Sequence, residues 1–204
     1  MRPKRIAVFI SGRGSNFAAI LGEINKGEIN GRITVVISDN PAAAGLRYAD
    51  ENGIECAVFQ KNRGEPKNDY FARISTFLKE RNIDLIVLAG FMKLLTPNII
   101  QEYRNRILNI HPALLPSFPG VHAQKQALDY GVKFSGCTVH FIDEGVDTGP
   151  IVLQEAVPVH QGDTEEMLAG RILEKEHKIF PRAVKLFCDN KLVSKGRHVY
   201  IKER

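Results

Sequence analysis

Short runs of β-branched and other apolar residues alternate along this chain with longer amphipathic segments. The apolar runs predict strands at Arg5–Ile10, Ile33–Ser38, Glu55–Phe59, Asp84–Ala89, Ile107–Ile110, Gly136–Ile142 and Ile151–Val159. The amphipathic segments predict helices at Ser15–Lys26, Ala42–Asn52, Asn68–Arg81, Thr96–Arg104 and Val121–Tyr130. The first and fourth strands are apolar nearly throughout, as in sheets covered on both faces. We therefore expect an α/β fold: a Rossmann-like open, mostly parallel twisted sheet with helices on both faces.

The last third of the chain adds a long helix to this pattern. Asp163 or Thr164 is its expected N-cap, and the helical pattern runs to about Asp189. Pro181 should kink or interrupt this helix, because proline lacks the amide hydrogen that a helix interior uses. A late hairpin is expected over residues 192–201. The chain has no internal repeat, low-complexity tract or long linker, so we expect one domain over residues 1–204.

Composition is that of a water-soluble globular protein. Of the 204 residues, 44% are hydrophobic and 25% are charged, which excludes disordered and fibrous classes. The longest apolar stretch, near Leu85–Gly90, is far shorter than the roughly 20 residues that span a bilayer. The first ten residues lack the apolar core of an export signal, and the three cysteines form no C-x-x-C pair. These features predict a cytoplasmic protein with reduced cysteines and no membrane partner.

The net charge of +5 is concentrated at the two chain ends. Residues 1–5 carry +3 and residues 191–204, which include Arg204, carry +4, so residues 6–190 carry −2. A nucleic-acid module would instead carry a basic stripe across its fold. The charge distribution therefore predicts no nucleic-acid partner.

The loop after the first strand, Ser11–Asn16, suits an anionic ligand. Its two glycines allow a tight turn, and Ser15 and Asn16 lie where a helix dipole is positive, so a phosphate is the favoured ligand. A tight turn with a helix cap is the simpler alternative. Phe17 stands where a dinucleotide fingerprint needs glycine or alanine, although Asp39 after the second strand could contact a ribose.

Two further strand ends carry candidate catalytic groups. Asn109 and His111 are two residues apart in a strand, so their side chains project to the same face. An amide and an imidazole together can stabilise an oxyanion and transfer protons. Asp147, in the acidic loop Asp143–Pro150, could lie beside His111, raise its pKa and hold it as the imidazolium ion. A structural histidine and a solvated turn are the alternatives.

The histidine and acidic residue spacings do not match metal-binding motifs. His111, His122 and His140 lack the spacings of zinc enzymes, and the acidic loop lacks the pattern of a calcium loop. We therefore predict no metal.

As a set, these motifs resemble the phosphoribosylglycinamide formyltransferase family, the folate-dependent enzymes of purine synthesis, over essentially the whole chain and in order. The segments that carry the resemblance are Phe9–Asn16, Leu88–Lys93, Leu108–Pro116, and His140-Phe141 leading to Asp147–Pro150. The segment from Asn109 and the later Asp147 mark the wider folate formyltransferase superfamily. The Ser-Gly-x-Gly-Ser-Asn loop narrows the resemblance to the ribonucleotide enzymes.

The resemblance implies roles for individual residues. It implies catalysis by Asn109, His111 and Asp147. It implies that the ribonucleotide phosphate and its surroundings are bound by Gly12, Arg13, Gly14, Ser15, Asn16 and Glu176. It implies that 10-formyltetrahydrofolate, the co-substrate, is bound by Lys67, Met92, Lys93, Leu94, Leu95, Asn109, Asp143, Glu144, Gly145, Val146 and Asp147. Arg13 stands where relatives often carry asparagine, and the alignment at Lys67 is loose.

Glu176 also stands out by its spacing in the long helix. Ala169, Leu173, Glu176 and Phe180 share one helical face, so a carboxylate is expected where core residues belong. The alternative is a glutamate at the edge of that face, paired with lysine.

The expected reaction is transfer of a formyl group from 10-formyltetrahydrofolate to the amine of N1-(5-phospho-D-ribosyl)glycinamide. Asn109 and protonated His111 would stabilise the tetrahedral oxyanion, and Asp147 would accept the amine proton through water. Methionyl-tRNA formyltransferase and formyltetrahydrofolate deformylase share the core motifs but carry additional domains, so length disfavours both. A non-catalytic phosphate-binding module is a third alternative. A homodimer is one option for the oligomeric state.

Overall fold

The computed structural model describes residues 2–203, so Met1 and the charge of Arg204 lie outside the described residues. The chain forms two compact units, Met1–Leu108 and Asn109–Arg204. A division into compact units does not test whether the two fold together. The single domain over residues 1–204 therefore stays a prediction.

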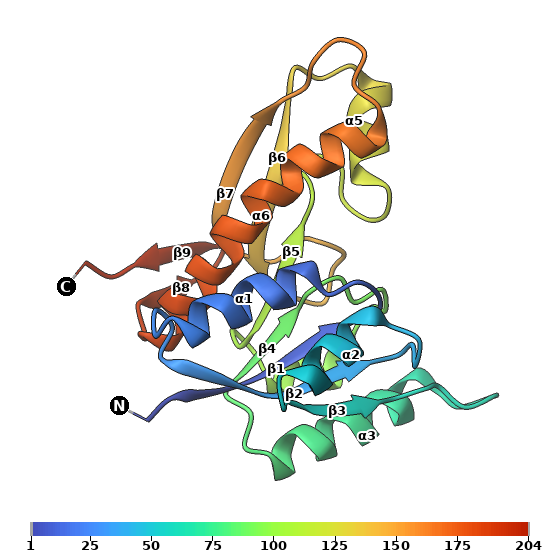
Figure 1. Ribbon diagram of the computed structural model, residues 1–204, viewed down its shortest axis with the longest axis vertical. Coiled ribbons are helices and arrows are strands. Elements are labelled where there is room, and N and C mark those ends of the chain that lie inside the picture. Colours follow the sequence, from blue (N-terminus) through green and yellow to red (C-terminus); the bar gives the residue numbers. More distant parts are fainter. Residues whose placement is uncertain (1, 204) are drawn as a thin grey trace. The chain divides into compact units, whose positions relative to one another are not determined.

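The first unit consists of parallel strands connected through helices. Its elements are β1 (Lys4–Ile10), α1 (Ser15–Asn25), β2 (Gly31–Ser38), α2 (Ala44–Glu51), β3 (Glu55–Val58), α3 (Lys67–Glu80), β4 (Leu85–Leu88) and α4 (Pro97–Glu102). β5 (Ile107–His111) begins in this unit and ends in the second. The strands lie in the order β3-β2-β1-β4, and each is parallel to its neighbour. α1 and α2 cover one face of these strands and α3 covers the other (Figure 1).

The core of the first unit lies around β1 and β4. Residues Ile6–Ile10 and Leu85–Leu88 are almost completely buried, as expected for apolar strands with helices on both faces. The chain adds β2 and β3 on one side of β1 and then returns to add β4 on the other side. The strand order therefore reverses between β1 and β4. In open α/β sheets, ligands bind beyond the carboxyl ends of the strands at such a point.

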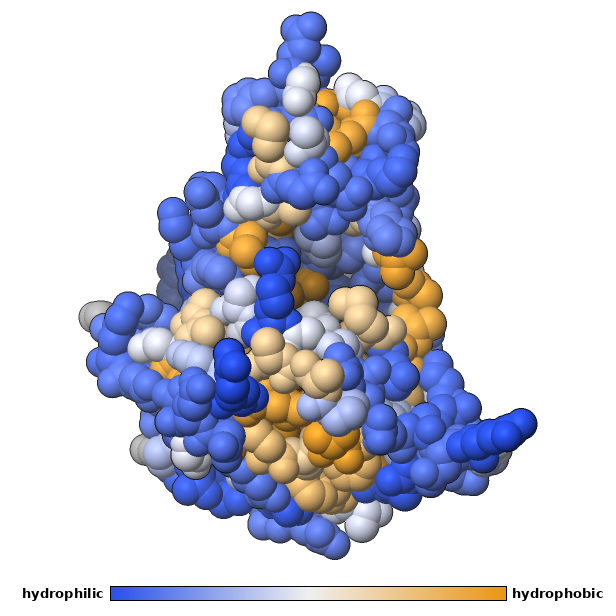
Figure 2. All heavy atoms as spheres, turned by 45° about the vertical axis from the view of Figure 1, so that its right-hand side comes forward, coloured by the Kyte–Doolittle hydropathy of each residue, from blue (hydrophilic) through white to orange (hydrophobic). Residues whose placement is uncertain are grey.

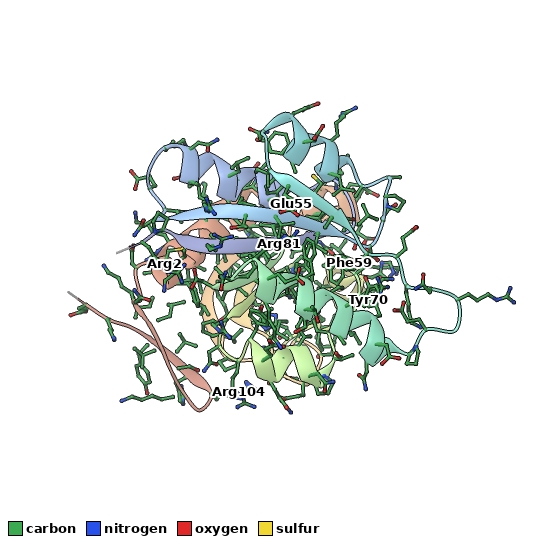
Figure 3. The ribbon with its side chains drawn as sticks, turned by 90° about the horizontal axis from the view of Figure 1, so that it is seen from below. Arg2, Glu55, Phe59, Tyr70, Arg81 and Arg104 are labelled. Carbon is green, nitrogen blue, oxygen red and sulfur yellow. The ribbon has the colours of Figure 1, made fainter. Side chains whose placement is uncertain are left out.

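Polar contacts fix α3 to the outer strand of this sheet (Figure 3). Arg81, which follows α3, forms an ion pair with Glu55 of β3 at 2.6 Å, and its guanidinium lies over the ring of Phe77. The hydroxyl of Tyr70 donates a hydrogen bond to the carbonyl oxygen of Phe59 at 2.8 Å. These contacts attach α3 to the β3 edge of the sheet.

The second unit combines antiparallel strands with one long helix. Its elements after β5 are α5 (Ala123–Tyr130), β6 (Phe134–Phe141), β7 (Ile151–Pro158), α6 (Glu165–Cys188), β8 (Leu192–Lys195) and β9 (His198–Ile201). The strands lie in the order β6-β7-β9-β8, with β6–β7 and β8–β9 antiparallel. A parallel pair between Ile151 and His198 joins β9 to β7. α6 packs against β6 and β7 (Figure 1).

Of the predicted kink or interruption at Pro181, the interruption is wrong, because α6 runs without a break from Glu165 to Cys188. The kink stays a prediction. Pro181 is buried in the apolar face of the helix, and packing of that face outweighs the one backbone hydrogen bond that proline removes. Of the two predicted N-caps, Thr164 is the cap, because its hydroxyl accepts the amide hydrogen of Met167 at 3.3 Å. Asp163 instead forms an ion pair with Arg171 at 2.8 Å.

The predicted α/β class, with open and mostly parallel strands and covering helices, is confirmed. The predicted strands and helices agree with the structure to within a few residues, as with Ile33–Ser38 against Gly31–Ser38 for β2.

Within residues 2–203, no helix combines the length and the hydrophobicity that crossing a membrane requires. One face of the molecule is mainly hydrophilic with hydrophobic residues exposed between the polar ones (Figure 2).

Two glycines with opposite surroundings give a test of this packing. A Cβ at Gly136 in β6 would lie 2.0 Å from the carbonyl oxygen of Glu155, whereas one at Gly22 in α1 would meet nothing within 4 Å. We expect Gly136→Ala to lower the free energy of unfolding by about 1–3 kcal/mol, because β7 backbone must move. Gly22→Ala should raise it by up to about 1 kcal/mol, because glycine is disfavoured within a helix.

Urea denaturation of both variants measures the two changes. Equal stability of Gly136→Ala and the wild type would contradict the close approach of β6 and β7 at this position.

Candidate active site

Two loops meet at the carboxyl ends of β1 and β4, where the strand order reverses. Ser11 begins the predicted phosphate loop after β1, and Gly90 lies in the segment after β4. The amide N–H of Ser11 donates to the carbonyl oxygen of Gly90 at 3.0 Å. The amide N–H of Met92 donates to Oγ of Ser11, also at 3.0 Å. The predicted phosphate loop and the predicted folate segment Met92–Leu95 are therefore neighbours in the first unit.

Asp39, which follows β2, fixes the junction of these two loops. Ser11 donates from Oγ to Oδ1 of Asp39 at 2.6 Å, and Nζ of Lys93 lies 3.1 Å from Oδ2. Each carboxylate oxygen therefore contacts a protein group, and Asp39 holds the two loops together.

The start of α1 has the geometry of an anion site. Gly14 has a left-handed backbone, with φ 75°, and precedes α1 without a side-chain cap. A Cβ on Gly14 would lie 3.0 Å from the Cα of Gly45, whose amide N–H donates to the carbonyl oxygen of Gly12 at 3.1 Å. The first amide groups of a helix find no acceptor within the helix and carry partial positive charge. Ser15 begins the helix and Arg13 is exposed beside it.

The other predicted site residues of the first unit differ widely in exposure. Asn16 is buried in the first turn of α1. Met92 and Leu94 are 72% and 59% exposed, and Leu95 is buried. Lys67 is exposed at the first position of α3, a separate helix. The junction at Ser11 thus brings together the phosphate loop and the Met92 segment, and does not include Lys67.

In the second unit, two histidines and a backbone amide lie against one carboxylate. Oδ2 of Asp147 accepts the amide hydrogen of Gly120 at 2.7 Å and lies 3.4 Å from Nδ1 of His111. Oδ1 lies 3.6 Å from Nε2 of His140. Nδ2 of Asn109 lies 3.1 Å from the same Nε2 of His140. The predicted trio of Asn109, His111 and Asp147 is brought together, with His140 as the link.

Asp147 is ionised although it is largely buried. Burial alone would raise its pKa, but the hydrogen bonds from His140 and the Gly120 amide, and the charge of His111 when that ring is protonated, together lower the pKa below the ordinary value of 3.8. Its backbone is left-handed, with φ 53°, a conformation that aspartate tolerates better than most residues. The cluster therefore contains a fixed negative charge at neutral pH.

The pKa of His111 is lowered, which contradicts the prediction that Asp147 raises it and holds the ring as the imidazolium ion. Its side chain is almost completely buried, and burial lowers its pKa below 6.5. The charge of Asp147 and the carbonyl of Phe118 oppose this effect without overcoming it. Nε2 lies 2.8 Å from the carbonyl oxygen of Phe118, so Nε2 carries the proton and Nδ1 faces Asp147.

Sequence reasoning missed His140 as a member of this cluster. Its ring is completely buried, and Nδ1 lies 2.9 Å from the carbonyl oxygen of Phe141. Because a carbonyl can only accept, Nδ1 carries a proton, and Nε2 lies between the amide of Asn109 and the carboxylate of Asp147. The Phe118 carbonyl and the Gly120 amide were also missed, because backbone groups leave no pattern in a sequence.

A β-bulge in the neighbouring strand lies opposite His140. Val139 pairs with Leu153, whereas His140 pairs with Ile151, so β7 has one extra residue at this point. A bulge changes the direction of neighbouring side chains and is frequent beside active sites. The available signal was a histidine next to the end of an otherwise largely apolar strand.

Within the predicted folate loop Asp143–Asp147, the side chain of Asp143 accepts hydrogen bonds from groups later in the chain. Oδ1 of Asp143 accepts from the amide of Gly145 at 3.1 Å and from the hydroxyl of Thr148 at 2.7 Å. Glu144, Gly145 and Val146 are exposed at the tip of the loop. Gly149 closes the other end, where a Cβ would lie 1.7 Å from the carbonyl oxygen of Phe141.

Glu176 is buried in α6, as its spacing predicts, with only 7% of its surface exposed. The buried stripe runs through Leu168, Ile172, Ile179 and Phe180, so it lies one residue away from the predicted Ala169 and Leu173. The position of Glu176 within the apolar face is confirmed. Its predicted contact with the ribonucleotide stays a prediction.

Cys137 is unsuited to act as a nucleophile. Burial, and then the charge of Glu176, raise the pKa of its thiol to about 12, so the reactive thiolate is scarce at neutral pH. Across residues 2–203, no three or more His, Cys, Asp or Glu side chains are arranged to hold a metal ion. A site without metal stays a prediction.

Comparison with known families identifies one domain type in this chain. The model of the formyl transferase family matches residues 4–184. The chain is 46% identical over 190 residues to the trifunctional purine biosynthetic protein adenosine-3 of Drosophila melanogaster, which covers 92% of this chain but only 14% of that protein. It is 39% identical to the phosphoribosylglycinamide formyltransferase of Haemophilus influenzae, over 97% of this chain and 93% of that protein.

Solved structures similar to this chain also come from enzymes that act on formyl groups. Glycinamide ribonucleotide transformylase 1 from Symbiobacterium toebii has a TM-score of 0.96 and 47% identity, over 99% of this chain and 95% of that chain. A formyltetrahydrofolate deformylase from Pseudomonas syringae has a TM-score of 0.92 and 26% identity, over 98% of this chain and 66% of that chain. The fold alone therefore does not separate a transferase from a deformylase.

The neutral state of His111 predicts a pH dependence of stability. Because its pKa is lower in the folded protein than the ordinary 6.5, the unfolded chain binds this proton more readily. The stability due to neutral His111 is complete above about pH 6.5 and is lost as the pH falls through the folded pKa. We expect the free energy of unfolding to decrease between about pH 7.5 and about pH 5.5, and to decrease less in His111→Gln.

Urea denaturation at both pH values measures this difference, and the exposed His160, replaced by glutamine, controls for the loss of one histidine. A His111→Gln variant with the full pH dependence of the wild type would contradict a neutral, buried His111.

Proposed function

This chain belongs to the formyl transferase family, and we propose that it transfers the formyl group from 10-formyltetrahydrofolate to the amine of N1-(5-phospho-D-ribosyl)glycinamide in purine biosynthesis. The observation that carries this proposal is the cluster in which His111 and His140 lie against the ionised Asp147 and Asn109 contacts His140. Such a cluster provides both N–H donors for an oxyanion and a base for a proton. The proposed products are the N2-formyl ribonucleotide and tetrahydrofolate.

The donors for the tetrahedral oxyanion are the amide of Asn109 and Nε2 of His111. Asn109 has two amide hydrogens, of which one is directed to His140, so the other is available to substrate. The Nε2 hydrogen of His111 is held by the carbonyl oxygen of Phe118, and the substrate oxygen would replace this carbonyl as its acceptor. A neutral imidazole suffices for this role, because the proton is donated as a hydrogen bond. Removing one such donor typically lowers kcat by about 10²- to 10³-fold.

Asp147 is the proposed base. The attacking amine must lose a proton as its nitrogen bonds to the formyl carbon, and Asp147 accepts it, through water, because the carboxylate is ionised. A proton is then delivered to N10 of the folate as the bond from N10 to the formyl carbon breaks, so one proton leaves the amine and one reaches the leaving group. No covalent intermediate on the protein is required, which agrees with the inert state of Cys137.

The two substrates have separate proposed sites. The backbone of Gly12–Gly14 and the start of α1, with Ser15 and Asn16, suit the phosphate of the ribonucleotide. Arg13 and Glu176 are proposed to add contacts to the same substrate. The folate is proposed to bind along Met92–Leu95, with its pterin against the loop Asp143–Asp147, which offers backbone groups and an exposed tip. Lys67 is the least supported of the proposed folate residues, because it lies on a separate helix.

The alternative function is hydrolysis of 10-formyltetrahydrofolate, favoured by the likeness to a formyltetrahydrofolate deformylase. Mixing the protein with the ribonucleotide and 10-formyl-dideazafolate separates the two functions, because loss of the formyl group changes the folate's absorbance. Release only with the ribonucleotide present supports the transferase. Release without it favours the deformylase, and no release at all favours a module that only binds phosphate ligands.

The proposed compartment, metal requirement and partners rest on the sequence. We propose a cytoplasmic protein that needs no metal ion and has small molecules, the ribonucleotide and a reduced folate, as its partners. The concentration of positive charge at the chain ends supports the proposal that nucleic acid is not among them. A homodimer remains one option for its oligomeric state.

Asp147→Asn tests the proposed base. Asparagine has nearly the same shape and tolerates the left-handed backbone of this position, so the fold should persist. The amide cannot accept the amine proton, and we expect kcat to fall by roughly 10²- to 10⁴-fold. Steady-state kinetics measures this fall, and thermal denaturation checks that the fold is retained. Near-normal turnover in a folded Asp147→Asn variant would exclude this role for Asp147.

A further inference from the structure

Arg197, in the turn between β8 and β9, holds the loop that carries Asp147. Both terminal nitrogens of its guanidinium donate to the same acceptor, the carbonyl oxygen of Thr148, at 3.0 and 2.9 Å. Thr148 directly follows Asp147 in the chain. Two charge-assisted hydrogen bonds to one carbonyl fix the orientation of that peptide group more strongly than a single neutral bond.

The surroundings of the loop make this contact important. Asp147 and Thr148 line a cavity of about 610 Å³, together with Leu115, Pro119, Arg197 and Tyr200. The loop therefore borders this cavity. The pairing of Ile151 with His198 joins β7 to β9. Arg197 adds hydrogen bonds from the β8–β9 turn to the loop itself.

The loop's own contacts leave the Thr148 carbonyl to Arg197. Asp143 holds the amide of Gly145 and the hydroxyl of Thr148, and the amide of Gly120 holds the carboxylate of Asp147. None of these bonds involves the Thr148 carbonyl, whose direction depends on the backbone torsions between Thr148 and Gly149, one residue beyond Asp147. A shift of this peptide group transmitted along the chain would move the carboxylate relative to His111 and His140, which lie only 3.4 and 3.6 Å from its oxygens.

We propose that Arg197 is a positioning residue for the formyl transfer: by holding the Thr148 carbonyl, it keeps the Asp147 carboxylate against the two histidines. This inference rests on the proposed function for its kinetic consequences, whereas its structural consequence, a held loop, does not. Arg197 acts through the loop and is not proposed to touch the substrates.

The test compares Arg197→Ala and Arg197→Lys with Lys195→Ala. Lys195 lies on the same hairpin, where its ammonium faces the ring of Tyr200, so its removal takes away an equal charge without a loop contact. For each protein, kcat, both KM values and the pH profile of kcat are measured. Hydrogen exchange of the backbone amides in residues 143–149 is measured in parallel.

We expect Arg197→Ala to lower kcat by roughly 10- to 100-fold, the size of effect that a small misplacement of a catalytic group produces. KM for the phosphorylated amine should change little, because its proposed phosphate loop is untouched. The acidic limb of the kcat profile should move to higher pH, because a displaced Asp147 loses hydrogen bonds that lower its pKa. Loop exchange should accelerate, Arg197→Lys should restore part of each property, and Lys195→Ala should match the wild type.

Unchanged kcat and unchanged loop exchange in Arg197→Ala would overturn the inference, and so would equal effects of Arg197→Ala and Lys195→Ala. If Arg197→Ala does not fold, Arg197→Lys decides: faster loop exchange with lower kcat supports the inference, and wild-type values of both contradict it. A wild-type protein without formyl transfer would instead contradict the proposed function, and the exchange measurement would still test the held loop.

Discussion

The candidate active site depends on keeping one carboxylate ionised in a largely buried position. Burial by itself raises the pKa of Asp147, whereas the Gly120 amide and the neighbouring histidines lower it below the ordinary value of 3.8. Each of these groups is delivered by a different element: His111 by β5, His140 by β6 and Gly120 by the loop before α5. The environment of Asp147, the proposed base, therefore depends on the packing of several elements of the second unit.

The patterns that were readable in the sequence are those that local physics dictates. Unbroken apolar runs such as Leu85–Leu88 predict buried parallel strands, and two glycines before Ser15 predict a tight turn into a helix. Asn109 and His111 could be paired because strand alternation puts them on one face, and both meet the cluster around Asp147. Chemistry confined to one element or one turn was thus predictable.

The features that sequence reasoning missed depend on tertiary packing. His140 joins the cluster next to a bulge in which β7 gains a residue, and no local pattern marks that bulge. The charge state of His111 depends on how deeply the ring is buried, and burial outweighs the neighbouring carboxylate. Pro181 remains within α6 because its helix face is packed. In each case the sum of distant contacts decides against the local preference.

The central claim is that an ionised Asp147 lies beside a neutral His111. Nitrogen-15 NMR of the histidine rings tests it most directly, because protonated and bare ring nitrogens have well-separated chemical shifts. At about pH 7.5, the account predicts a proton on Nε2 of His111 alone, with Nδ1 bare toward Asp147. A ring with both nitrogens protonated at that pH, or with its proton on Nδ1, would contradict it.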